Sequence, residues 1–170
     1  MCTMIRRILI APLVLFLPLM HAYAKTDQAK LPPPVNLQHD GIRAEREGKP
    51  VVILFTLPDC SYCHVVRRNY LAPLLRNGEQ PIIREVTLNG TASFRGFNGE
   101  PLTHGQFARS NNVRFVPTVM FFGPAGKQLT DPLSGVDSAG LYGGLLENAF
   151  SVSEKKLSGL SPNQQRNVKE

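Results

Sequence analysis

The feature that most constrains the fold of this chain is a run of apolar residues that ends in a turn carrying two cysteines. Residues 51–55, VVILF, form a short continuous apolar run, which is typical of a strand buried on both faces. Residues 58–59, Pro-Asp, then predict a turn, and apolar residues recur at helical spacing from Tyr62 onward. The sequence therefore predicts that Cys60 and Cys63 lie at the beginning of a helix, directly after a buried strand.

The predicted helix start would make one of the two cysteines reactive. A helix N-terminus concentrates unpaired N–H groups and partial positive charge, which stabilise an anion. Cys60 is therefore favoured as a thiolate, the reactive form of cysteine, and Cys63 lies one turn further on, where it would resolve a mixed disulfide. His64 follows the pair directly and, when protonated, would favour the thiolate further. The alternative is that His64 is simply a residue of the helix surface.

The first 24 residues have the composition of a cleavable signal peptide. Arg6 and Arg7 precede an apolar stretch over residues 8–20, and residues 22–24, AYA, supply the small side chains of a cleavage site. We therefore expect export to the periplasm and a mature chain that begins near Lys25. An uncleaved anchor helix is the alternative.

Removal of this segment leaves two cysteines, both in one CxxC motif, and lowers the formal net charge from +6 to +4 because two arginines leave with it. The remaining charge is spread along the chain, so we expect no nucleic-acid partner. A disulfide between residues three apart closes almost no loop and stabilises little through chain entropy. Structural disulfides of exported proteins usually link distant segments, so a redox role is favoured over a structural one.

The rest of the chain predicts an α/β fold, because strand-like and helix-like stretches alternate. We expect an extended lead-in over residues 25–40, one domain over residues 41–150 and a flexible polar tail over residues 151–170. The predicted elements are a short helix over 37–48 capped by Asn36, a helix after the cysteines that Pro73 interrupts, a strand over 81–88, a helix over 104–112, a strand-forming run over 113–122, a turn over 123–126 with a hairpin partner over 127–130, and a last helix from Asp137 or Ser138 through Phe150.

Two of these predictions concern packing. The last helix would bury one face, formed by Leu141, Leu145, Leu146 and Phe150. Residues 90–103 show no periodicity, and we interpret them as a surface excursion rather than a functional loop.

Pro117 lies inside the strand-forming run, where a proline is unexpected. A cis Val116–Pro117 bond would explain it by exposing a backbone edge beside the cysteines, where Val116 would pair with an extended substrate segment. Most X–Pro bonds are trans, so the residues by themselves leave both isomers open.

The stretches VVILFTLPDCSYCH (residues 51–64) and VRFVPTVMFFGPAGK (residues 113–127) resemble the thioredoxin superfamily, in particular its exported bacterial thioredoxin-like and Dsb-type members. The resemblance covers roughly residues 41–150. It implies a thioredoxin fold, with a central mixed sheet flanked by helices and a terminal β-hairpin and helix. It also implies a thiol–disulfide oxidoreductase whose site residues are Cys60 as nucleophile, Cys63 as resolving cysteine, Pro117 as cis-proline and Val116 in contact with substrate, with Tyr62 as a further substrate contact.

The same resemblance implies protein thiol or disulfide clients, a membrane or soluble redox partner, and no cofactor or metal besides the redox-active disulfide. We expect a monomer and prefer the reductase direction, with a disulfide oxidase or isomerase as alternatives. Leu54 stands where thioredoxin has a buried aspartate, so Glu85 or a water would have to accept the proton of the resolving thiol. The Ser61-Tyr62 dipeptide is similar to that of exported isomerases, but residues 25–48 are too few for their dimerisation domain.

Two alternatives from other functional classes remain. Residues 60–64 also satisfy C-x-x-C-H, the haem attachment pattern of exported c-type cytochromes, for which Met120 is the candidate second axial ligand. The strand-like run before the motif argues against this hypothesis. The other alternative is a non-catalytic thioredoxin fold that binds peptides or copper through the two thiolates and His64.

Overall fold

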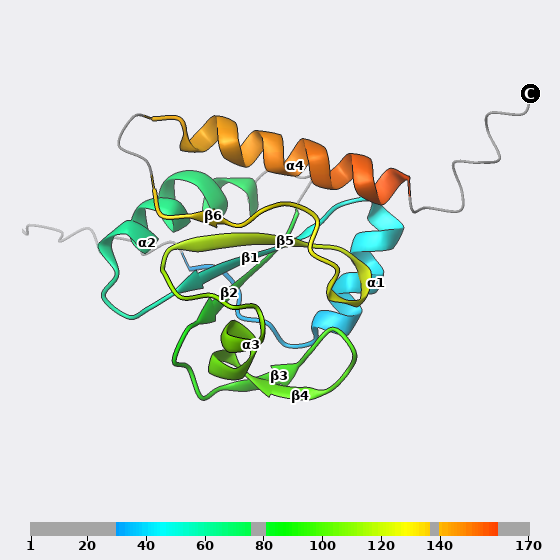
Figure 1. Ribbon diagram of the computed structural model, residues 1–170, viewed down its shortest axis with the longest axis horizontal. Helices are drawn as coiled ribbons and strands as arrows, with labels where there is room; N and C mark the ends of the chain where they lie inside the picture. The colour runs from blue at the N-terminus through cyan, green and yellow to red at the C-terminus, as the bar shows by residue number, and fades with distance from the viewer. Residues whose placement is uncertain (1–29, 76–80, 137–139, 160–170) are drawn as a thin grey trace, which may run out of the picture.

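The computed structural model describes residues 30–75, 81–136 and 140–159, which form a four-stranded mixed sheet with helices on both faces (Figure 1). The strand order is β2-β1-β5-β6. β1 (Val51–Thr56) is parallel to β2 (Ile82–Thr87) and antiparallel to β5 (Thr118–Phe122), and the short β6 (Leu133–Ser134) is antiparallel to β5. The predicted α/β fold with a mixed sheet is confirmed.

The helices divide into two layers. α1 (Leu37–Glu47) and α3 (His104–Ser110) pack on one face of the sheet. α2 (Ser61–Val65), its continuation as the π-helix η1 (Val66–Leu71), and α4 (Tyr142–Ser158) lie on the other face (Figure 1). The two cysteines therefore belong to the layer that contains α4.

β1 is the centre of both hydrophobic cores. Val52 and Leu54 pack with residues of η1 and α4, whereas Val51, Ile53 and Phe55 pack with residues of α1 and α3. All six residues of the strand are buried. This confirms the prediction of a strand buried on both faces, and it explains why a continuous apolar run was needed in place of an alternating one.

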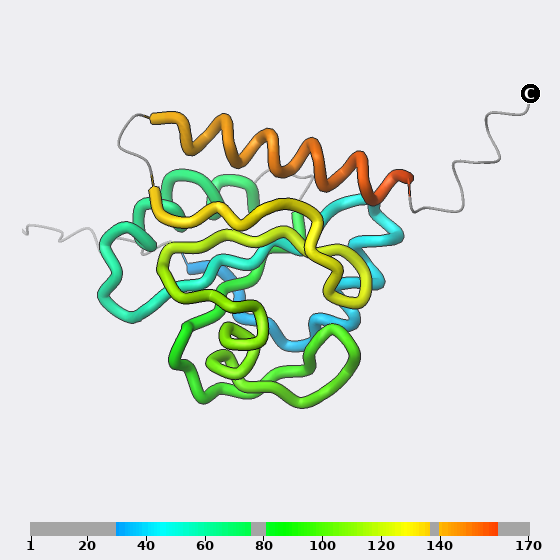
Figure 2. The backbone as a smooth tube through the Cα atoms, in the orientation of Figure 1, coloured from blue at the N-terminus to red at the C-terminus, as the bar shows by residue number. Residues whose placement is uncertain are grey.

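The segment before α1, blue in Figure 2, belongs to the domain more fully than we predicted. The side chain of Asn36 accepts a hydrogen bond from the His39 N–H at 3.0 Å and caps α1, as expected. The predicted lead-in over 25–40 is wrong at its end, because the helix begins at Leu37. Ahead of the helix Leu31 is buried, and the Pro32 carbonyl accepts a hydrogen bond from the Glu85 N–H of β2.

The helix after the cysteines is irregular, as Pro73 predicts. It changes from α2 to the π-helical η1 and then to the 3₁₀ turn η2 (Ala72–Leu75). A proline cannot donate a backbone hydrogen bond to the preceding turn, so the regular helix ends before it.

Residues 90–103 are not a surface excursion, and that interpretation is wrong. They contain an antiparallel pair, β3 (Ser93–Arg95) and β4 (Pro101–Thr103). Phe94 and Phe97 are buried against Phe107 of α3, with ring centroids 5.5 and 6.2 Å away. Strands of three residues are too short to show a period, which is why the pattern is invisible in the sequence.

The hairpin after β5 also differs from the prediction. β5 begins at Thr118, and residues 127–130 contribute an isolated bridge, Phe122 to Gln128, rather than a strand. The strand that follows β5 in the chain and pairs with it is β6. Leu129 is buried in the core instead, with its N–H donating to the Phe121 carbonyl at 2.8 Å.

The last helix is longer than predicted, and the face that it buries differs from the predicted one. α4 continues to Ser158, so the predicted flexible tail begins too early, and the proposed caps Asp137 and Ser138 lie outside the described residues. Leu146 is buried and Phe150 is half-buried, but Leu141 and Leu145 are exposed. The buried face of the helix consists of Tyr142, Leu146, Ala149, Ser153 and Leu157. Because a serine and an alanine occupy core positions, a pattern of large apolar residues does not predict this face.

Within the described residues, none of the helices has the length and apolarity that a membrane span requires.

Candidate active site

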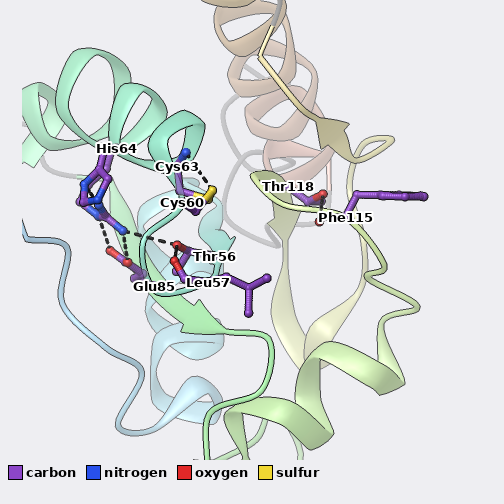
Figure 3. Close-up of a disulfide and its surroundings, with 9 residues drawn as sticks. Thr56, Leu57, Cys60, Cys63, His64, Glu85, Phe115 and Thr118 are labelled. Atoms are coloured by element: carbon purple, nitrogen blue, oxygen red, sulfur yellow. Dashed lines mark hydrogen bonds and ion pairs between the residues drawn. A yellow bond between two sulfur atoms is a disulfide. The ribbon is translucent and has the colours of Figure 1, made fainter.

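The two cysteines lie where β1 delivers the chain to the start of α2, and they form a disulfide (Figure 3). The S–S distance is 2.09 Å and the Cα atoms are 5.2 Å apart. Cys60 is the N-cap of α2, and its Sγ accepts a hydrogen bond from the Cys63 N–H at 3.2 Å. The sulfur of Cys60 thus occupies the position at which a capping anion is stabilised by the unpaired N–H groups of a helix.

The two sulfur-bearing residues differ in exposure. Cys63 is fully buried, whereas Cys60 is partly exposed. A partner protein can therefore reach the sulfur of Cys60 before that of Cys63, which is buried. This is the arrangement in which one cysteine attacks and the other resolves.

Pro117 lies at the same edge of the sheet. The antiparallel register pairs Phe55 with Thr118, so the residue before Thr118 lies level with the end of β1, where the cysteine turn begins. The Val116–Pro117 peptide bond is cis. The Pro117 carbonyl accepts a hydrogen bond from the Gly135 N–H at 2.7 Å, which ties this loop to the segment after β6.

Two exposed aromatic side chains come from the segments that carry the disulfide and the cis-proline, and we call them the apolar rim. Tyr62, between the cysteines, is 65% exposed, and Phe115, two residues before Pro117, is 73% exposed. Thr118 Oγ1 donates to the Phe115 carbonyl at 2.9 Å and so holds the loop in place (Figure 3). Tyr62 is among the residues predicted from the sequence, whereas Phe115 is not, because an aromatic residue in a strand-forming run is expected in the core.

A second group of side chains forms what we call the polar flank: His64, Arg67 and Glu85. Arg67 binds the Glu85 carboxylate through two hydrogen bonds, Nε to Oε2 at 2.8 Å and Nη2 to Oε1 at 2.5 Å. The Nη1 of Arg67 also lies 2.9 Å from His64 Nδ1. Arg67 thus connects His64 with Glu85. His64 and Glu85 are among the residues predicted from the sequence, whereas Arg67 is not.

The side chains of the polar flank line a cleft of about 360 Å³, and the residues of the turn before Cys60 line it as well. His104, at the start of α3, lines it and accepts a hydrogen bond on Nδ1 from the Thr87 N–H at 3.1 Å. Burial lowers the pKa of His104 below its usual value, and the Glu85 carboxylate acts in the opposite direction.

Leu54, at the position of thioredoxin's buried aspartate, is fully buried in the core shared with η1 and α4. The acidic group of this site thus comes from β2, not from β1.

The haem hypothesis finds no support in the placement of its second ligand. Met120 is buried in the core on the α1 and α3 face, opposite Ile53 in the middle of β1. Met120 is therefore separated from the turn that carries Cys60 by the second half of β1. In the described part of the chain, no three His, Cys, Asp or Glu side chains are grouped in a way that would hold a metal ion.

The fold and the disulfide site together define a thioredoxin-fold protein. A family model described as a thioredoxin-like domain matches residues 37–148, well over half of the chain, and the chain belongs to this family. No curated protein sequence matches it.

Among solved structures, the chain is similar to a poplar thioredoxin h, with 20% identity over 65% of this chain and 86% of that chain and a TM-score of 0.46. It is also similar to thioredoxin f from spinach chloroplast, with 17% identity over 74% and 96% of the two chains and a TM-score of 0.48. A thioredoxin-fold protein from Helicobacter pylori has 15% identity over 80% and 92%, with a TM-score of 0.46.

Proposed function

We propose that this chain is an exported thiol–disulfide oxidoreductase that acts on protein disulfides. The observation that carries the proposal is the asymmetry of the pair: Cys60 is partly exposed at a helix N-cap, and Cys63 is buried one turn behind it. A thiolate at the N-cap is stabilised by the helix terminus and is accessible, which are the two requirements of an attacking cysteine.

In the reductase direction the reaction runs through one mixed disulfide. The Cys60 thiolate attacks one sulfur of a client disulfide, and the other client sulfur leaves as a thiolate that takes up a proton. Cys63, deprotonated, then attacks Cys60 Sγ and releases the second client sulfur in the same way. The products are a reduced client and the Cys60–Cys63 disulfide, which a membrane or soluble redox partner must reduce again with two electrons.

Client binding is assigned to the loop of the cis-proline and to the apolar rim. An extended client segment would pair with the backbone of Val116, as in strand addition. Tyr62 and Phe115 would cover apolar client side chains next to the target cysteine. The exposure of both side chains in the free protein, 65% for Tyr62 and 73% for Phe115, supports this role, because a partner that covers them removes apolar surface from water.

The signal-like composition of residues 1–24, which lie outside the described residues, supports the proposed export to the periplasm. The preferred direction is reduction, and the protein is proposed to act as a monomer on protein clients, without nucleic acid. A reduction potential near about −270 mV would support a reductase, and one near about −120 mV a disulfide donor. Titration of the Cys60–Cys63 pair against a thiol buffer decides between them.

The catalytic proposal is tested with two single variants. Cys60→Ser is expected to abolish the reduction of insulin disulfides, because it removes the attacking sulfur. Cys63→Ser retains Cys60 and is expected to accumulate mixed disulfides with clients, because nothing resolves them. Insulin reduction by Cys60→Ser at the wild-type rate would refute the proposal. A Soret band in the purified exported protein would instead establish the haem hypothesis.

A further inference from the structure

The polar flank contains a part-buried ion pair, Arg67 with Glu85, and Arg67 belongs to the helical segment that begins after Cys60. Residues 60, 64 and 67 are spaced by four and three positions, so their side chains follow one another along one side of the helix. Arg67 links this face to Glu85 of β2, and it also lies 3.5 Å from the Oγ1 of Thr56, the last residue before the cysteine turn. The residues just before Cys60, Pro58 and Asp59, line the same cleft as Arg67 and Glu85.

We propose that the Arg67–Glu85 ion pair sets the stability of the Cys60 thiolate and thereby the reduction potential of the Cys60–Cys63 pair. Glu85 acts as a positioning residue, which holds Arg67 and offsets its charge. The inference deepens the proposed function and rests on it.

The hydrogen bonds of Arg67 determine which group supplies the positive charge. A guanidinium has donors only and keeps its charge at every working pH, so Arg67 is the donor in the contact with His64 Nδ1. Arg67 is therefore the permanent cation of the polar flank. The stability of the Cys60 thiolate therefore depends on the positive charge of Arg67 and on the fraction of that charge that Glu85 offsets.

Burial makes this pair more influential than the other charges around the cleft. The charged and titratable residues that line the cleft are Lys30, Asp59, His64, Arg67, Glu85 and His104. Lys30 and Asp59 are exposed, and water and salt screen their effect on the sulfur. The side chains of Arg67 and Glu85 are only 12% and 18% exposed, so their fields are screened less.

The two members of the pair must act on the thiolate in opposite directions. Glu85→Gln removes a negative charge but keeps a side chain that hydrogen-bonds Arg67. Arg67 is then uncompensated, so the thiolate, and with it the reduced form, becomes more stable and the potential rises. Arg67→Met keeps the apolar stem but leaves Glu85 unpaired, which destabilises the thiolate and lowers the potential.

The test measures two properties of the purified full chain and its variants. The reduction potential is obtained by equilibration with a thiol buffer, and the thiolate fraction of Cys60 by ultraviolet absorbance across pH. We expect each variant to change the thiol–disulfide equilibrium constant threefold to tenfold, in opposite directions; tenfold corresponds to about 30 mV. The double variant, Glu85→Gln with Arg67→Met, should return toward the wild-type value.

Glu47→Gln is the matched control. It removes the same charge from another arginine-paired glutamate, at 3.1 Å from Arg43, but at the end of α1 that precedes the start of β1. Its potential should equal that of the wild type. If Arg67→Met does not fold, Arg67→Lys replaces it and should keep a potential near the wild-type value, because the charge is retained.

Shifts of equal sign in Glu85→Gln and Arg67→Met, or shifts no larger than that of Glu47→Gln, would overturn the inference. Because a merely structural role would weaken the same contacts in either variant, it predicts equal signs. Failure here is separable from failure of the proposed function. Insulin reduction that requires Cys60 would uphold the function even if the potential ignored the ion pair.

Discussion

The apolar rim and the polar flank belong to segments of the same candidate site but differ in composition, burial and origin. The rim consists of two aromatic side chains that are more than half exposed and have little to pack against in the free protein. The flank consists of polar side chains that are bonded to one another, and its two charged members, Arg67 and Glu85, are only 12% and 18% exposed. An exposed apolar surface gains free energy only when a partner covers it, whereas a buried charge acts on the sulfur at all times. The rim is thus suited to selecting clients, and the flank to setting the redox equilibrium.

The largest expected effect comes from adding an acidic group to the core beside the flank. Leu54→Asp would place a carboxylate in the apolar cluster, at the position paired in register with Glu85. We expect the free energy of unfolding to fall by about 3 kcal/mol at neutral pH, because the charge would be buried without a partner. Denaturant unfolding measures the loss.

The pH dependence of Leu54→Asp identifies its cause. Burial would raise the pKa of the new carboxyl, so the penalty is smallest below about pH 4, where the unfolded chain is protonated too, and grows as the pH rises. Leu54→Asn is the control, with a similar size and no charge, and its loss should not follow this titration. A Leu54→Asp variant as stable as the wild type at neutral pH would mean that the core beneath the disulfide is open to water.

A second test removes the rim. Tyr62→Ser combined with Phe115→Ser should lower kcat/KM for protein disulfides by about tenfold, since about 1.4 kcal/mol of apolar contact with the client is lost. The reduction potential should stay unchanged. Ile42→Ser, at a side chain of α1 that is 61% exposed, is the matched control and should leave kcat/KM unaltered. A potential that shifts in the rim variant would contradict the division between rim and flank.

The smallest expected effect concerns His104 at the far side of the cleft. Its pKa is lowered by burial, so the folded protein binds fewer protons than the unfolded chain as the pH falls through about 6.5. The stability that His104 contributes is therefore complete above that pH and is lost below it, toward its lowered folded value. His104→Asn keeps an acceptor for the Thr87 N–H and should show a flatter pH dependence of unfolding between about pH 7 and 5. An equal slope in both proteins would show that His104 does not couple folding to protons.

The strand, the cysteine turn and the positions of the two sulfurs follow from the sequence because they are contiguous. VVILF predicts the buried strand, and the next residues bring Cys60 to the N-cap. The predictions that failed depended on partners far along the chain. Phe94 and Phe97 are buried by distant partners, Phe107 of α3 and, for Phe97, also Phe122 of β5. Ser153 occupies a core position that no apolar pattern can indicate.

The sequence by itself determined the fold class and identified Cys60 and Cys63, since the spacing of a helix turn is a local property. Only the tertiary structure decided what surrounds them. Arg67 and Glu85 are 18 residues apart, and they meet because the parallel register of β1 and β2 and the phase of the helix bring both to one cleft. Phe115 is exposed because the strand-forming run becomes a strand only after Pro117. Register, helix phase and strand start are set by packing between elements, and no local stretch of residues specifies them.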